Sequence, residues 1–233
     1  LEAKVTEVAG DYPFQQYSTF LTNHDQNRIF EQVGRSASRN KVAAAILLTA
    51  PGVPFLYYGE EVGMLGVYPH ENIRRPMQWD AGANAGFTTG TPWYEMNSNA
   101  GQWNVETLAA DPGSLWNHYR QLVQARAASP ALRRGTYHTL TASSGSLYPF
   151  LRRYQDDAVI VVHNLAVGTV GSFSLAAEAS QLAPGTYAAV NMFTGADLPE
   201  LTVGENGYIQ SWAPVAYMTG NTSLLARLTL VQP

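Results

Sequence analysis

Two short apolar runs separated by one helical pattern constrain the fold more than any other feature of this sequence. Residues 17–22 predict a buried strand that ends at the polar cluster Asn23-His24-Asp25. Residues 38–50 predict a helix, and residues 53–58 predict a second strand that ends at Gly59-Glu60-Glu61. Because polar residues follow both strands and a helix joins them, this order predicts a βαβ unit of a parallel sheet.

Capping residues mark the expected helix ends. Ser38 suits the N-cap of the helix at 38–50, and Asp111, followed by proline, predicts the start of another helix that ends at Ser129. The stretch between residues 63 and 110 is rich in Gly, Asn, Pro and Trp and predicts a long irregular segment. The expected apolar stripe of the later helix consists of Leu115, Tyr119, Leu122 and Val123.

The pattern changes near residue 136, after which the chain predicts strands only. The strand candidates are residues 137–141, 147–154, 158–165, 170–175, 185–191 and 210–218. Their spacing is typical of two antiparallel sheets packed face to face. We therefore expect two domains, at residues 1–135 and 136–233.

Composition excludes several classes of function. The 233 residues include 14 basic and 18 acidic ones, with no run of Lys or Arg, so we expect no nucleic-acid or anionic-membrane partner. Without Cys there is no disulfide, no thiolate nucleophile and no Cys-based zinc site. The longest apolar stretch, residues 42–50, is far short of the ~20 residues of a membrane span. The chain begins at Leu1, and we expect it to be part of a longer protein.

The polar clusters at the two strand ends are the candidate functional residues. Ligands of parallel α/β folds bind at the carboxyl ends of strands. A carboxylate next to an imidazole, as at His24 and Asp25, can hold a cationic or hydroxyl-rich ligand. The alternative is a strand-end turn whose polar groups satisfy one another. Glu60 and Glu61 are adjacent and would point to opposite faces of an extended segment, which favours salt-bridge or loop-anchoring roles.

Four ordered segments carry a resemblance to a known family. They are residues 20–28 (FLTNHDQNR), 51–64 (PGVPFLYYGEEVGM), 73–80 (IRRPMQWD) and 85–93 (AGFTTGTPW). Together they resemble the α-amylase family, glycoside hydrolase family 13, in its branch of bacterial α-amylases and oligosaccharide α-glucosidases. The resemblance covers residues 17–134, whereas the β-rich remainder fits the C-terminal sandwich of the family by pattern only. Arg75 departs from the family, many of whose members carry Thr there.

The resemblance implies a fold and a reaction. The fold is the last two βα units of a (β/α)₈ TIM barrel followed by a C-terminal antiparallel β-sandwich, a combination of α/β and all-β classes. The reaction is retaining hydrolysis of α-glucosidic bonds in starch or maltooligosaccharides, which needs two carboxyl groups about 5 Å apart. Asp25 falls on the third catalytic carboxylate of the family, His24 on a partner of the sugar-ring hydroxyls, and Arg74 on an arginine near the sugar.

In this family the nucleophile and the acid/base lie on the fourth and fifth barrel strands, and the first signature segment lies on the third. The chain contains neither a Gly-Phe-Arg-x-Asp nor an Asp-x-x-x-Asn-His segment. We therefore expect the chain alone to be inactive. The missing N-terminal part of the barrel, or another copy, would have to cover the open edge of its first strand.

Alternatives remain for the function and for single residues. The longer protein to which this chain is expected to belong could be an α-glucan transglycosylase or isomerase, or a non-catalytic carbohydrate-binding or interaction module. Arg74 could instead form an ion pair that holds the long loop. Arg28 could steer the Asp25 carboxylate or cap the next helix, of which the structural role is favoured, and Arg75 is expected to be solvated or to pin the loop. The loop aromatics, Trp79, Trp93 and Trp103 among them, could stack on sugar rings or pack the loop. No metal site or cofactor is expected in this chain, calcium being possible in a full-length enzyme, and an extracellular location is favoured.

Overall fold

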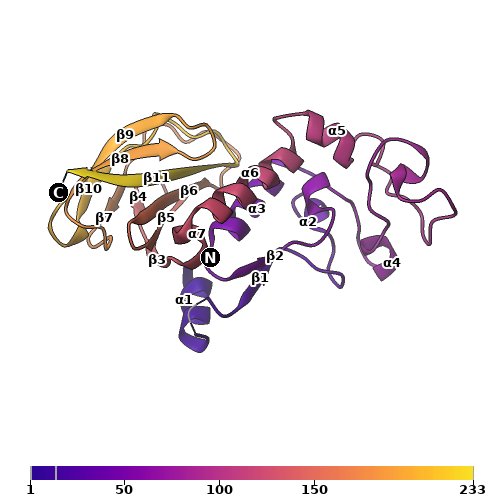
Figure 1. Ribbon diagram of the computed structural model, residues 1–233, viewed down its shortest axis with the longest axis horizontal. Helices are drawn as coiled ribbons and strands as arrows, with labels where there is room; N and C mark the ends of the chain where they lie inside the picture. Colours follow the sequence, from indigo (N-terminus) through magenta and orange to yellow (C-terminus); the bar gives the residue numbers. More distant parts are fainter. Residues whose placement is uncertain (1, 14, 233) are drawn as a thin grey trace. The chain divides into compact units, whose positions relative to one another are not determined.

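The computed structural model describes residues 2–13 and 15–232, which divide into two compact units (Figure 1). One unit comprises residues 18–47 and 54–122 and contains both predicted strand-end clusters. The other comprises residues 123–232, the described residues up to Tyr17 and the segment 48–53. No helix within the described ranges is both long and apolar enough to cross a lipid bilayer.

Short elements and long loops make up the first half of the chain. The elements are α1 (Glu2–Asp11), β1 (Ser18–Phe20), α2 (Ile29–Gln32), α3 (Ala37–Thr49), β2 (Val53–Phe55), η1 (Glu60–Val62), α4 (His70–Ile73), η2 (Ala83–Gly86), α5 (Val105–Ala110), α6 (Leu115–Ala128) and α7 (Pro130–Arg134). β1 and β2 are hydrogen-bonded neighbours in a two-stranded sheet, with α3 between them in sequence. The predicted order of strand, helix and strand is confirmed, whereas α1, α2, α4, α5 and α7 were not predicted.

Both strands are half the predicted length because the chain turns soon after each of them. Downstream of β1, the Asn23 side chain accepts a hydrogen bond from the Asp25 N–H at 2.9 Å, which closes a tight turn. Downstream of β2, Gly59 adopts a φ of 82°, and a Cβ atom there would lie 2.2 Å from the Met64 sulfur. Glycine is therefore required at the turn that leads into η1.

The predicted N-cap of the first helix is wrong by two residues. α3 begins at Ala37, so Ser38 lies inside the helix. The hydroxyl of Ser36 accepts a hydrogen bond from the Arg39 N–H at 3.4 Å, which is the geometry of a cap. Of two serines two positions apart, the sequence pattern selected the inner one.

The predicted start of the second helix is also wrong. The carboxylate of Asp111 accepts from the Gly113 N–H at 2.8 Å and so closes a turn that precedes the helix. α6 begins at Leu115, and the Ser114 hydroxyl accepts the Asn117 N–H at 3.1 Å as its cap. Val123 was assigned to the apolar stripe but is 44% exposed, whereas the other three residues of that stripe are buried.

Two antiparallel sheets form the C-terminal part, as the coarse prediction required. The six-stranded sheet has the order β3 (Thr136–Thr139), β5 (Leu147–Tyr154), β6 (Asp157–Asn164), β11 (Thr222–Gln232), β8 (Gly185–Asn191) and β9 (Asp197–Val203). The three-stranded sheet has the order β10 (Ile209–Trp212), β7 (Leu175–Ala177) and β4 (Thr141–Ala142). Buried apolar residues of both sheets form one continuous core, which includes Leu151, Leu175 and Leu224.

The strand predictions succeeded where a hairpin or a clear turn bounded the strand. The bounds of β5 and β8 match the predicted ranges, and β6 is displaced by one residue. The range 137–141 divides into β3 and β4, and the ranges 170–175 and 210–218 were largely wrong, because β7 and β10 are short and displaced. β9 and β11 were not predicted, although β11 is an inner strand that pairs with β6 and β8. Pro199 lies in β9, which is an edge strand, the position that tolerates proline.

Two buried arginines bind main-chain carbonyls at the C-terminal end of α3. Arg126 donates to the carbonyls of Leu48 and Ala50 at 2.9 and 3.1 Å. Arg152 donates to the carbonyl of Thr49 at 2.6 Å and to that of Gly135 at 2.9 Å. Burial lowers the pKa of Arg126 to about 10 and that of Arg152 to about 9. Both groups remain cationic at neutral pH and compensate the unsatisfied carbonyls of the helix end.

Candidate active site

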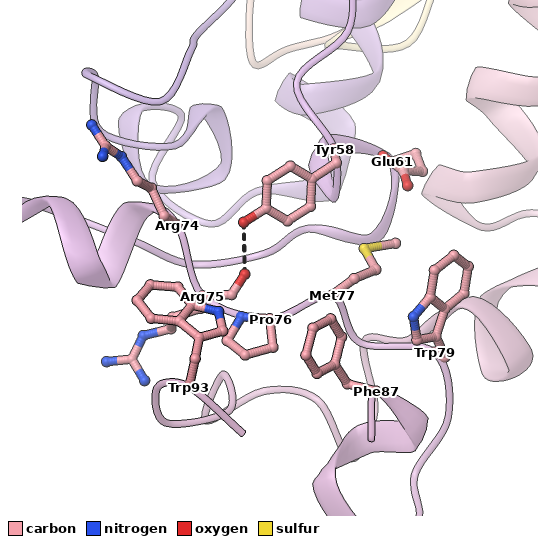
Figure 2. A pocket seen from close by; sticks show the side chains of 9 residues that line it. All are labelled: Tyr58, Glu61, Arg74, Arg75, Pro76, Met77, Trp79, Phe87 and Trp93. Carbon is pink, nitrogen blue, oxygen red and sulfur yellow. Dashed lines mark hydrogen bonds between the residues drawn. The ribbon is translucent and has the colours of Figure 1, made fainter. Parts of the chain in front are cut away.

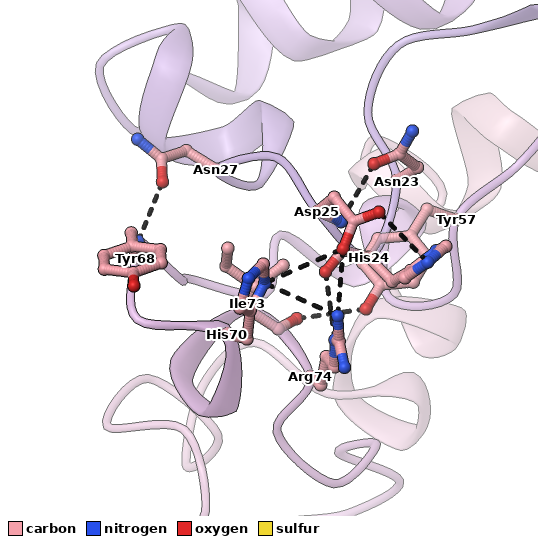
Figure 3. Close-up of polar contacts among 9 residues, drawn as sticks. All are labelled: Asn23, His24, Asp25, Asn27, Tyr57, Tyr68, His70, Ile73 and Arg74. Atoms are coloured by element: carbon pink, nitrogen blue, oxygen red, sulfur yellow. Dashed lines mark hydrogen bonds and ion pairs between the residues drawn. The ribbon is translucent and has the colours of Figure 1, made fainter.

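The site begins at the turn after β1. His24 and Asp25 lie side by side there, with the His24 Nε2 3.2 Å from the Asp25 Oδ2 (Figure 3). The Asn23 turn fixes the main chain of the aspartate. The side chain of Asp25 is 57% exposed and that of His24 is 63% exposed, so both are available to a ligand.

Arg74, which follows α4, reaches this turn from 49 residues away. Its Nη2 donates to the Asp25 Oδ1 at 3.0 Å, and its Nε donates to the His24 carbonyl at 3.0 Å. The structure therefore brings together all three predicted site residues. An ion pair this exposed is worth at most ~1 kcal/mol, so its main effect is to orient the carboxylate.

His70 is a further member of the cluster that sequence reasoning missed. Its Nδ1 lies 3.8 Å from the Asp25 Oδ1 and 3.4 Å from the Arg74 Nη2 (Figure 3). His70 is the first residue of α4 and Arg74 directly follows the last one, so one helical turn puts these two side chains on one side. The spacing was visible in the sequence, but the segment was predicted to be irregular.

A buried arginine supports the main chain beneath the cluster. Arg28 is 1% exposed and donates from Nε to the Ile73 carbonyl at 2.8 Å and from Nη1 to the Tyr58 carbonyl at 2.6 Å. Its guanidinium lies 4.5 and 4.6 Å from the ring centres of Tyr57 and Tyr58. Arg28 thus has a structural role, but the expected helix cap is wrong, because its side chain makes no capping hydrogen bond to α2. Its bond to the Ile73 carbonyl instead fixes the residue directly before Arg74.

The second strand-end cluster contributes a buried acid. Glu60 is 2% exposed, and its Oε1 accepts a hydrogen bond from the Thr22 hydroxyl at 2.7 Å. Burial raises the pKa of Glu60 to about 7 and also raises the pKa of Glu61. Neither carboxylate forms a salt bridge with another described residue, so the salt-bridge hypothesis is not supported. Glu60 instead anchors the strand that leads into the His24-Asp25 turn.

The loop between η1 and α5 is fastened by Arg75. Its guanidinium donates to the Asn72 Oδ1 at 2.7 Å and to the Met96 carbonyl at 3.1 Å, and it lies 5.2 Å from the ring centre of Tyr94. The loop-pinning role favoured for Arg75 is confirmed. Trp103 packs against Phe30 with ring centres 4.7 Å apart.

An open pocket of about 400 Å³ lies beside Arg74 (Figure 2). Four of its nine lining residues are aromatic, and we call it the aromatic pocket; the lining consists of Tyr58, Glu61, Arg74, Arg75, Pro76, Met77, Trp79, Phe87 and Trp93. All of these residues belong to the unit that contains the Asp25 cluster. Among residues 2–13 and 15–232, no group of three or more His, Asp or Glu side chains is arranged to hold a metal ion.

Comparisons with known proteins identify the family. Residues 2–135 match the family described as alpha amylase, catalytic domain. Alpha-amylase 3 of Dictyoglomus thermophilum is 36% identical over 148 residues, which is 63% of this chain and 29% of that protein. Oligo-1,6-glucosidase of Halalkalibacterium halodurans is 32% identical over 201 residues, which is 69% of this chain and 36% of that protein.

Comparison with solved structures points to the same family. The crystal structure of α-amylase from H. orenii superposes with a TM-score of 0.68 at 34% identity and covers 90% of this chain and 39% of that one. The chain thus spans well under half the length of these relatives. Because the family match extends over more than half of its residues, the chain belongs to the α-amylase catalytic-domain family of glycoside hydrolases.

Proposed function

We propose that this chain is part of a retaining glycoside hydrolase that cleaves α-glucosidic bonds in starch or maltooligosaccharides. The observation that carries the proposal is the Asp25 carboxylate, held by Arg74 at 3.0 Å between the imidazoles of His24 and His70. An exposed carboxylate in a fixed orientation, surrounded by hydrogen-bond donors, suits a ligand rich in hydroxyl groups.

Each residue has a role in this proposal. Asp25 binds ring hydroxyls and stabilises the positive charge that develops on the sugar ring in the transition state. His24 and Arg74 donate hydrogen bonds to sugar hydroxyls, and Arg74 also orients Asp25. The nucleophile and the acid/base are supplied by another part of the protein, so the chain alone does not turn over substrate.

The same proposal extends to the architecture. Residues 1–135 are taken as the C-terminal part of a catalytic (β/α)₈ barrel, to which β1 and β2 contribute its last two strands. Residues 136–233 are taken as a C-terminal β-sandwich domain. Support comes from the exposed rings of Phe20 in β1 and Phe55 in β2, which are 47% and 58% exposed. Apolar strand faces of this kind require a cover, and the N-terminal part of the barrel or another copy would provide it.

The test is the replacement Asp25→Asn in the product of the complete reading frame. We expect kcat for maltooligosaccharides to fall by at least ~100-fold, the scale of losing an electrostatic transition-state contact, with an unchanged melting temperature. Glu71→Gln is the matched control, because it removes a nearby exposed carboxylate that has no role in the proposal. A kcat within a fewfold of wild type in the Asp25 variant would refute the assigned role.

Product analysis in the same experiment separates the alternatives. Release of free sugar with retained anomeric configuration supports hydrolysis, whereas transfer of the glucosyl unit to a second sugar supports a transglycosylase or isomerase. Sugar binding without any turnover by the complete protein would support a non-catalytic module. Turnover by the isolated 233-residue chain would contradict the proposal that its partner segment carries two of the catalytic groups.

A further inference from the structure

The hydrogen bonds of the Arg74 guanidinium divide it into a fixed side and a free side. Its Nε donates to the His24 carbonyl and its Nη2 donates to the Asp25 Oδ1, both at 3.0 Å. The same Nη2 lies 3.4 Å from the His70 Nδ1 (Figure 3). Among the residues that the structure describes, none accepts a hydrogen bond from Nη1. The fixed side thus consists of Nε and Nη2, whereas Nη1 remains available to a ligand.

Only one protonation state of His70 permits its contact with Arg74. Arginine donates hydrogen bonds and accepts none, so the His70 Nδ1 must carry a lone pair, and the ring proton must lie on Nε2. The side chain of His70 is 44% exposed, so the Nε2–H can bond to water. A proton on Nδ1, in the other tautomer or in the imidazolium, would face the Nη2–H of Arg74 as donor against donor.

A proton on Nδ1 would also turn His70 from Arg74 toward Asp25. The Nδ1 lies 3.8 Å from the Asp25 Oδ1, and a shift of about 1 Å would bring the two atoms to hydrogen-bonding distance. Besides Asp25 and Arg74, which carry opposite charges, the imidazole contacts the ring of Tyr68, with ring centres 5.3 Å apart. Neutral His70 therefore supports Arg74, whereas protonated His70 would compete with Arg74 for one oxygen of the carboxylate.

We propose that neutral His70 is a positioning residue, which holds the fixed side of Arg74 so that Asp25 is oriented and Nη1 is presented to the sugar. The inference rests on the proposed function and adds a pH-dependent element to it. Histidine is the side chain whose charge ordinarily changes between pH 5 and pH 8. His70 thus makes the orientation of the Asp25 carboxylate depend on pH in this range.

The test compares kcat/KM for maltooligosaccharides from pH 8 to pH 5 in the complete protein and in two variants. His70→Leu removes the acceptor, and we expect kcat/KM at pH 8 to fall about fivefold, the scale of losing one hydrogen bond. His70→Asn keeps an acceptor oxygen that does not titrate, so it should match wild type at pH 8. Its ratio to wild type should rise about fivefold toward pH 5, as wild type loses the same bond. The titrations of the nucleophile and the acid/base cancel in this ratio.

A matched control and a spectroscopic measurement complete the test. His138→Asn replaces a histidine of β3, in the other unit, and should give a ratio to wild type that is flat from pH 8 to pH 5. The ¹⁵N shifts of the His70 imidazole, identified by their absence from His70→Asn, should show the proton on Nε2 at pH 8. This readout reports the hydrogen bond to Arg74 and does not depend on turnover.

The outcomes separate this inference from the proposed function. If wild-type protein cleaves oligosaccharides but the ratio for His70→Asn is flat, or the proton lies on Nδ1 at pH 8, the positioning role is refuted and the function stands. An equal loss in His70→Asn and His70→Leu at pH 8 would also refute it, because an acceptor would then not be what Arg74 requires. If wild-type protein cleaves no sugar, the proposed function fails, and the inference that rests on it fails too.

Discussion

Glu60 makes the stability of the chain depend on pH in a direction opposite to that of most carboxylates. Burial raises the pKa of Glu60 from 4.5 to about 7, and the neighbouring Glu61 carboxylate raises it further. The hydrogen bond from Thr22 and the positive charge of Arg28 oppose this rise but do not cancel it. The free-energy cost of burying the ionised Glu60 carboxylate is thus larger than the stabilisation that Thr22 and Arg28 provide.

The magnitude follows from the two pKa values. A rise from 4.5 to about 7 corresponds to about 3 kcal/mol at 1.36 kcal/mol per pKa unit. Between these pH values the folded state binds more protons than the unfolded state, so the free energy of unfolding falls as the pH rises. The contribution of protonated Glu60 is complete below pH 4.5 and is lost as the pH rises through about 7.

The perturbation that isolates this effect is Glu60→Gln. Glutamine keeps an oxygen that can accept the bond from Thr22 and carries no charge at any pH. We expect the variant to gain about 3 kcal/mol relative to wild type between pH 4.5 and pH 8, measured as the difference in the free energy of unfolding by urea. Glu71→Gln, which removes an exposed carboxylate, is the control and should leave the pH dependence of wild type unchanged.

One result would refute the reasoning. If the difference between wild type and Glu60→Gln is the same at pH 4.5 and at pH 8, Glu60 does not titrate between these values in the folded protein. Burial would then not dominate its environment, and the bond from Thr22 together with Arg28 would be sufficient to hold the ionised form.

Two further predictions concern buried groups of the C-terminal part. Arg152→Met should lower the free energy of unfolding by at least ~3 kcal/mol, because buried carbonyls, those of Thr49 and Gly135 among them, lose charged donors; urea unfolding, with the exposed Arg134→Met as control, checks this. His163 is fully buried, with its Nδ1 2.8 Å from the Ser223 hydroxyl, and burial lowers its pKa to about 3. Its imidazole should therefore stay neutral from pH 8 to pH 4 in an NMR titration, and a midpoint near 6 would contradict this burial.

Local sequence patterns predicted the parts of the fold that depend on neighbouring residues. The hairpin of β5 and β6 is an example, because alternating apolar residues and a two-residue turn lie within one short segment. β11 was missed, although it lies between β6 and β8, because its partners are the residues 158–164 and 186–191. Leu224, Ala226 and Leu228 alternate toward the core, so a strand pattern was present in the sequence, but the central place of that strand depends on its pairing with distant segments.

The candidate site also has one part that local sequence predicted and another that depends on distant segments. The sequence by itself determined the types of residue at the end of β1 and their proximity, since His24 and Asp25 are adjacent and the turn that orients them is closed by Asn23. Tertiary structure alone decided that Arg74 and His70 meet this carboxylate, since the chain must return over more than 40 residues to bring them there.

Burial was likewise decided only by the tertiary structure. Glu60 and Glu61 are neighbours of the same type, yet one lies under the Thr22 hydroxyl and the other lines the aromatic pocket. Trp79 and Trp103 come from one loop, yet Trp103 packs against the Phe30 ring whereas Trp79 is 50% exposed. The physical reason is that the sequence specifies what each side chain can do, whereas the solvent and the partners around it depend on segments that only the folded chain brings together.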